Sequence, residues 1–132
     1  MKAAYVGVIL STLVLAGCLH EDSTPEYLTS WASADSVEVL SVEGLSVEFE
    51  VFGAKPTPCH EVIDPAVTEE VPERRVTVQM RSRIRRDTIC IQVIASHRTT
   101  IVVTVSAPGA WEFEFRDSFG DEPIVIGVNV PG

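Results

Sequence analysis

Hydrophobic and polar residues alternate with a period of two through most of the chain after residue 35, and this pattern restricts the fold more than any other feature. The alternation is clearest at 45–51, 74–84 and 111–116. Successive side chains of a β-strand point to opposite faces, so these segments predict strands with one face in a core and one in water. The pattern assigns to the core Leu45, Val47, Phe49, Val51, Val76, Val78, Met80, Ile84, Trp111, Phe113 and Phe115, and to solvent Ser46, Glu48 and Glu50.

The remaining segments extend the all-β pattern. Residues 88–94 are mostly β-branched, which is typical of a strand buried on both faces. Residues 100–106 and 123–130 predict two further strands. Residues 64–73 contain two prolines and four acidic residues, and they predict a solvated excursion or a loop that interrupts a strand. No stretch keeps a helical spacing of apolar residues for long enough to predict a helix.

Together these segments predict an all-β fold of six or seven short strands. A length of 132 residues suits one domain. The strand number and spacing favour an antiparallel β-sandwich of immunoglobulin-like size over residues 36–132, with a core domain of roughly 95 residues. A small barrel is the alternative, because the pattern alone does not determine whether the sheet closes.

The N-terminal residues have the organisation of a signal peptide. Lys2 is followed by an apolar stretch from Ala3 to Ala16 that is too short for a spanning helix, which needs roughly 20 residues. The stretch ends in Leu15-Ala16-Gly17-Cys18, which resembles the lipobox of bacterial lipoprotein precursors. The resemblance implies removal of residues 1–17 and diacylation of the Cys18 thiol with fatty acids such as palmitate. The alternatives are an ordinary secretory signal and a short anchor helix.

The residues after Cys18 bear on sorting and on the link to the domain. By resemblance to lipoproteins of diderm bacteria, Leu19 does not mark retention at the inner membrane, which favours the outer membrane if the host is diderm. Both the periplasmic and the exterior face stay open. Residues 18–35 are polar and predict a flexible tether. Tyr27, Leu28 and Trp31 favour docking of the end of the tether on the domain, or a short turn of helix there, over an exposed aromatic binding site.

Three cysteines are divided by this interpretation into one anchor and one pair. If Cys18 carries lipid, Cys59 and Cys90 remain in an oxidising compartment, and we expect them to form a structural disulfide. Free thiols or a redox pair are the alternative, although the Cys-x-x-Cys spacing is lacking. The Pro58-Cys59 loop, the Cys90 segment and the turn at residues 107–109 resemble small lipoproteins with a disulfide-stapled, immunoglobulin-like domain. That resemblance spans residues 47–130 and implies architecture without an activity.

The charge balance excludes a generic nucleic-acid binder. The net charge is −9 and the isoelectric point is near 4.7. Removal of residues 1–17 leaves 9 basic and 19 acidic side chains, a net charge of −10. Four of the nine basic residues are clustered at positions 81–86, namely Arg81, Arg83, Arg85 and Arg86. One interpretation is a docking patch for an anionic partner. The favoured alternative is pairing across strands with Glu48, Glu50, Glu112 or Glu114, or protection of an edge strand.

The sequence does not predict a catalytic site or a cofactor. A metal site would have to combine His60, Glu61 and Asp64 with His97, and surface histidines are the favoured alternative. Neither a Gly-x-Ser-x-Gly elbow nor a glycine-rich phosphate loop is present.

Three functional hypotheses follow. The favoured one is a lipid-anchored bacterial envelope protein with a non-enzymatic β-sandwich that binds an envelope protein or polysaccharide or has a structural role. The second is a small hydrolase or metal-dependent enzyme with its site near His60–Asp64. The third is an accessory subunit that docks an envelope machine through Arg81–Arg86.

Overall fold

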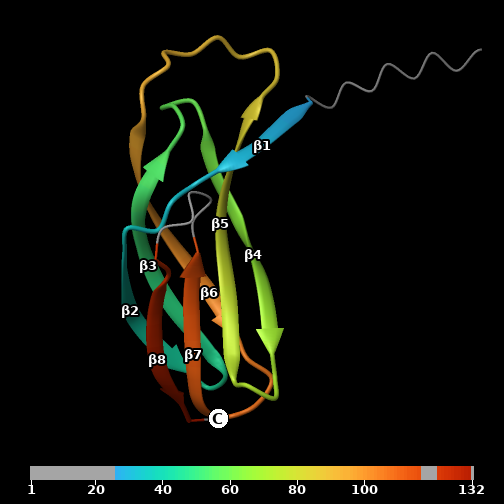
Figure 1. The fold of residues 1–132 in the computed structure, drawn as a ribbon, viewed down its shortest axis with the longest axis vertical. Coiled ribbons are helices and arrows are strands. Elements are labelled where there is room, and N and C mark those ends of the chain that lie inside the picture. The colour runs from blue at the N-terminus through green and yellow to red at the C-terminus, as the bar shows by residue number, and fades with distance from the viewer. Residues whose placement is uncertain (1–25, 117–121, 132) are drawn as a thin grey trace, which may run out of the picture.

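The computed structural model describes residues 26–116 and 122–131, which form two β-sheets packed face to face (Figure 1). Among these residues no helix is long and apolar enough to cross a membrane. The eight strands are β1 (Tyr27–Trp31), β2 (Ser36–Glu43), β3 (Ser46–Lys55), β4 (Glu61–Glu70), β5 (Arg75–Arg85), β6 (Ala95–Thr104), β7 (Gly109–Arg116) and β8 (Ile124–Val130). The predicted all-β sandwich is confirmed, with β1 as a strand that the sequence pattern did not indicate.

One sheet has the order β2-β3-β6, and the other is organised around β5. One edge of β5 pairs with β4. The opposite edge pairs with β7 along Arg75–Gln79 and then with β1 along Arg81–Arg85, and β8 extends the sheet beyond β7. All pairs are antiparallel except β5–β7, which is parallel. Strictly antiparallel pairing was therefore the wrong expectation at that one pair.

The alternating residues form the core between the sheets, as predicted. Phe49 of β3 contacts two aromatic rings of β7, with centroid distances of 4.9 Å to Phe113 and 5.2 Å to Phe115. Leu45 and Ile84 are only partly buried. Glu50 departs from the prediction because it is 7% exposed and forms an ion pair with Arg98 of the neighbouring strand. The fully buried members of the predicted set are Val47, Phe49, Val51, Val76, Val78, Met80, Trp111, Phe113 and Phe115.

The end of the predicted tether belongs to the fold. β1 pairs with β5, and the chain then crosses to the other sheet through the buried residues 32–34. The Ser33 amide donates to the Ala54 carbonyl at 2.8 Å, and the Asp35 amide donates to the Phe52 carbonyl at 2.7 Å. The predicted docking of this segment is confirmed, and the packed chain begins by Tyr27 rather than at residue 36.

Two segments differ from their predicted structure. Residues 88–94 form no strand, and Ile89, Ile91 and Ile94 are 99%, 71% and 70% exposed. The strand prediction was wrong there: the pairing of β5 with β1 ends at Arg85, and within the described part of the chain no strand pairs with residues 88–94. Residues 64–70 lie within β4 rather than in a loop. The break that Pro65 predicts appears as a register shift between Ile63 and Ala66 on an edge strand, where proline is tolerated.

Candidate functional site

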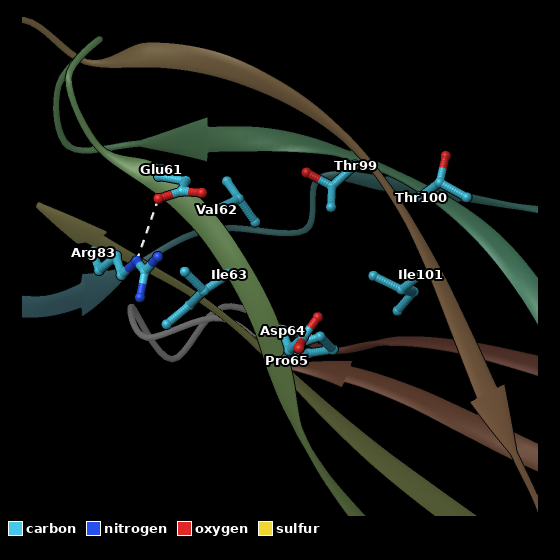
Figure 2. Close-up of a pocket in the computed structure, with 9 residues that line it drawn as sticks. All are labelled: Glu61, Val62, Ile63, Asp64, Pro65, Arg83, Thr99, Thr100 and Ile101. Carbon is cyan, nitrogen blue, oxygen red and sulfur yellow. Dashed lines mark hydrogen bonds and ion pairs between the residues drawn. The ribbon is translucent and has the colours of Figure 1, made fainter.

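A groove runs along the seam where β4 of one sheet faces β6 of the other (Figure 2). Its volume is about 420 Å³. A second hollow of about 410 Å³ continues it along the same two strands and shares Asp64, Pro65, Thr100 and Ile101 with it. The two hollows together are called the β4–β6 groove below. Their lining residues are Glu61, Val62, Ile63, Asp64, Pro65, Val67, Arg83, Thr99, Thr100, Ile101 and Val102.

The β4–β6 groove exists because both strands are at the edges of their sheets. Among the described residues, β4 pairs only with β5 and β6 pairs only with β3. Each strand therefore has one row of backbone amides and carbonyls without a strand partner on its outer side. Such a row is a template for an added strand.

The two edges differ in their ability to accept a strand. β4 has Pro65 and the register shift between Ile63 and Ala66, which are features that blunt an edge. β6 pairs with β3 without a register shift from Ala95 to Thr104, and residues 99–104 carry no charge. β6 is thus the regular edge of the groove, and β4 is the wall opposite it.

The side chains give the groove a chemical gradient along its length. At one end Glu61 pairs with Arg83 at 3.3 Å (Figure 2). The Arg83 guanidinium also stacks over the Tyr27 ring at 4.2 Å. The middle contains Asp64, whose carbonyl accepts from Arg81 at 2.6 Å. At the other end the rim is apolar, with Val102 63% exposed.

Buried polar contacts hold the region next to this groove. The His97 ring donates through Nε2 to the Ser33 carbonyl at 2.8 Å, and its Nδ1 lies 3.0 Å from the Thr99 hydroxyl. His60 forms a 2.7 Å hydrogen bond between Nδ1 and the Thr57 hydroxyl. Burial, and secondly the charge of Lys55, lower the pKa of His60 below its usual value of 6.5.

The favoured expectation of surface histidines is therefore wrong for His60 and His97, which are each 8% exposed. His97 lies in β6, and its ring is buried beside residues 32–34, where it bonds to the Ser33 carbonyl. Within the described residues, no group of three His, Cys, Asp or Glu side chains is arranged to hold a metal ion. His60 and Glu61 are neighbours in sequence with separate partners, Thr57 and Arg83.

The four clustered arginines all make contacts within the domain. Arg81 donates to the Asp64 carbonyl, Arg83 pairs with Glu61, and Arg85 lies 3.7 Å from Asp87. Arg86 pairs with Glu26 at 2.7 Å. Cross-strand pairing is thus present for Arg83, although with Glu61 rather than a predicted glutamate, and Arg86 pairs with Glu26 just outside β5 and β1. Of the predicted partners, Glu50, Glu112 and Glu114 pair instead with Arg98, Arg75 and Arg116.

The predicted disulfide is present in the structure. Cys59, in the turn after β3, is bonded to Cys90, in the segment between β5 and β6, with a Cα–Cα distance of 6.2 Å. The predicted lipidation site Cys18 lies outside the described residues.

Sequence reasoning missed the β4–β6 groove. Its two walls, residues 61–67 and 99–102, are 32 to 41 positions apart in the chain, and only the sandwich brings them together. Two local signals could have indicated it: Pro65, a residue tolerated on edge strands, and the uncharged β-branched run from Thr99 to Thr104.

Comparison with known proteins gives one family. No curated protein and no solved structure matches the chain significantly. Residues 49–124 match the ORF11 beta-sandwich domain family, and this region extends from the middle of β3 to the start of β8. It contains both cysteines of the disulfide and all residues of the β4–β6 groove. The chain belongs to the ORF11 beta-sandwich domain family.

Proposed function

We propose that this chain is a lipid-anchored, non-enzymatic module of the bacterial envelope that binds an extended segment of a partner protein in the β4–β6 groove. The observation that carries the proposal is the regular, uncharged edge of β6 beside that groove. An extended segment pairs with such an edge through its backbone, and alternate side chains enter the groove.

The backbone supplies affinity in this arrangement. Each hydrogen bond between the segment and the outer side of β6 contributes about 0.5–1.5 kcal/mol. Because β6 is already held in register by β3 over ten residues, its edge is ordered before the partner arrives. Preorganisation of this kind lowers the entropic cost of binding.

The side chains of the groove select the segment. Val67 and Val102 offer exposed apolar surface at one end, where an aliphatic side chain of the partner packs. The Asp64 side chain lies in the part shared by both hollows and favours a basic side chain. The preferred ligand is therefore an extended segment with an aliphatic and a basic residue on the same face.

Selection from a library of random 12-residue peptides tests the binding site. We expect selected peptides to bind the full chain and to lose at least tenfold in affinity for Val102→Lys, because a lysine on an edge strand blocks strand addition. The matched control is Val125→Lys, which places the same charge on an exposed position of β8, another edge strand. Equal affinity for the two variants, or no selection over protein-free wells, overturns the proposal.

Lipid anchoring is tested separately by metabolic labelling with palmitate. We expect label on the wild-type chain and none on Cys18→Ala, and we expect the wild type to fractionate with membranes. A wild-type chain without label overturns the anchor and leaves the peptide-binding result unaffected.

A further inference from the structure

The segment 88–94 lies at one end of the sandwich, between β5 and β6, and it is called the isoleucine loop below (Figure 1). Its aliphatic side chains are exposed. Ile89 is 99% exposed, Ile91 71% and Ile94 70%. Val93 adds a fourth aliphatic side chain at 51%. Four exposed aliphatic side chains within seven residues are typical of a contact with a membrane or another protein.

The isoleucine loop is held in shape by covalent and hydrogen bonds. Cys90 is bonded to Cys59, so the middle of the loop is fixed to the turn after β3. The Thr88 amide donates to the Arg85 carbonyl at 3.0 Å, and the Val93 amide donates to the Ile91 carbonyl at 3.0 Å. The aliphatic side chains on either side of Cys90 are therefore presented on an ordered backbone, which lowers the cost of inserting them into an apolar phase.

The N-terminal part of the chain joins the domain at the same end. The Arg86 amide donates to the Glu26 carbonyl at 2.9 Å, so the start of the packed chain lies beside the start of the loop (Figure 1). Cys18 is eight residues before Glu26. Eight extended residues span about 28 Å at most, so a lipid on Cys18 keeps this end of the sandwich close to the membrane surface.

The charges at this end fit a lipid interface. The isoleucine loop contains no ionisable side chain apart from the disulfide-bonded Cys90, so its insertion does not require a charge to leave water. Arg85, Arg86 and Asp87 come immediately before the loop. Arg85 pairs with Asp87 and Arg86 with Glu26, and the two arginine side chains are still 55% and 60% exposed. Guanidinium groups in that position lie at the level of lipid headgroups.

We propose that the isoleucine loop inserts into the lipid surface and holds the sandwich with its disulfide-bonded end against the membrane. The inference rests on the proposed lipid anchor, which sets the end of the domain that faces the bilayer. The loop would insert at the boundary between the acyl chains and the headgroups of the membrane that holds the anchor. The β4–β6 groove then begins near the membrane at Glu61 and extends away from it toward Val67.

Quenching by brominated phospholipids tests the insertion. The full chain is reconstituted in vesicles of phosphatidylethanolamine and phosphatidylglycerol at 3:1, with bromine on the acyl chains. We expect the emission added by Ile91→Trp, relative to the parent chain, to shift to shorter wavelength and to fall at least twofold. The matched control is Val125→Trp, an exposed aliphatic position in β8, which we expect to be unquenched.

The outcomes separate this inference from the proposed anchor. Palmitate-labelled protein in which Ile91→Trp is not quenched, or is quenched no more than Val125→Trp, overturns loop insertion and keeps the anchor. Quenching of Ile91→Trp in protein without palmitate supports insertion and overturns only the anchor. Because Ile91 is largely exposed, its replacement leaves the core intact, and unchanged thermal unfolding of Ile91→Trp verifies this.

Discussion

The two ends of the sandwich are closed in different ways. At the end that contains the turns after β2, β4 and β6, the chain reverses direction in a few residues, with positive φ angles at Gly44, Arg74 and Gly109. Trp111 and Arg74 also donate to the carbonyls of Ala107 and Pro108, at 2.8 and 3.2 Å. At the opposite end the connection between β5 and β6 is long, and the exposed isoleucine loop takes the place of a tight turn.

The difference shows where each end obtains its order. The turn end depends on local backbone geometry and on hydrogen bonds between neighbouring turns. The loop end depends on groups far apart in sequence: the Cys59–Cys90 bond, the contact of Gly53 with Ser33, and the buried histidines. Order of this second kind leaves the loop free to present apolar side chains, because its own residues do not have to pack.

Among the changes that test this difference between the two ends, removal of the disulfide is expected to lower the free energy of unfolding most. The bond closes a loop of 31 residues in sequence separation. The chain-entropy relation assigns to such a loop about 3.5 kcal/mol of stabilisation. We expect the double variant Cys59→Ser/Cys90→Ser to lose a free energy of unfolding of about that size, measured by urea denaturation.

Hydrogen exchange on the same variant locates the effect. We expect faster exchange at residues 86–97 and unchanged exchange at the turns that contain Gly44 and Gly109. Uniform acceleration at both ends would contradict the separation of the two ends. The single variant Val125→Ser, at an exposed position of β8, is the control for a general loss of stability.

The same contrast explains how much of the structure the sequence predicts. The core strands follow from alternation because Val47, Phe49 and Phe113 obey a rule that acts between nearest neighbours in the strand. The turn at 107–109 is predicted for the same reason, since proline and glycine act on their own backbone.

The structures of the loop end and of the groove depend on contacts between residues far apart in the chain, so local sequence patterns do not predict them. Residues 88–94 have the composition of a buried strand, yet among the residues that the structure describes no strand pairs with them, and the β1–β5 pairing ends at Tyr27 and Arg85. The burial of His97 could not be predicted from its neighbours in sequence either, because it depends on contact with the distant residues 32–34. The disulfide was predictable because counting cysteines requires no geometry.

Gly53→Ala is expected to have the second largest effect. A Cβ at Gly53 would overlap the carbonyl of Ser33 and lie 2.8 Å from His97 Nε2, so the crossing segment would have to move. Overpacking against backbone costs about 2–3 kcal/mol. The matched control is Gly127→Ala in β8, where a Cβ meets nothing within 4 Å. Thermal denaturation of both variants checks the prediction, and an equal loss for the two would remove Gly53 from the support of the loop end.

His60 makes stability at the loop end sensitive to pH, with the smallest expected effect. Burial lowers the pKa of His60 in the folded state below the usual 6.5, and the charge of Lys55 lowers it further. Below pH 6.5 the unfolded chain therefore binds a proton that the folded chain resists. The free energy of unfolding falls as the pH drops from 6.5 through the lowered pKa, and this contribution is fully present above 6.5. Two groups face His60: the Thr57 hydroxyl bonds to its ring, and the Lys55 ammonium donates to its carbonyl at 2.7 Å.

The variant His60→Gln keeps a hydrogen-bonding side chain and removes the titration. We expect its melting temperature to fall less between pH 7.5 and 5.5 than that of the wild type. Parallel pH profiles would show that protonation of His60 is not coupled to unfolding, and the loop end would then owe its order to the disulfide and to Gly53.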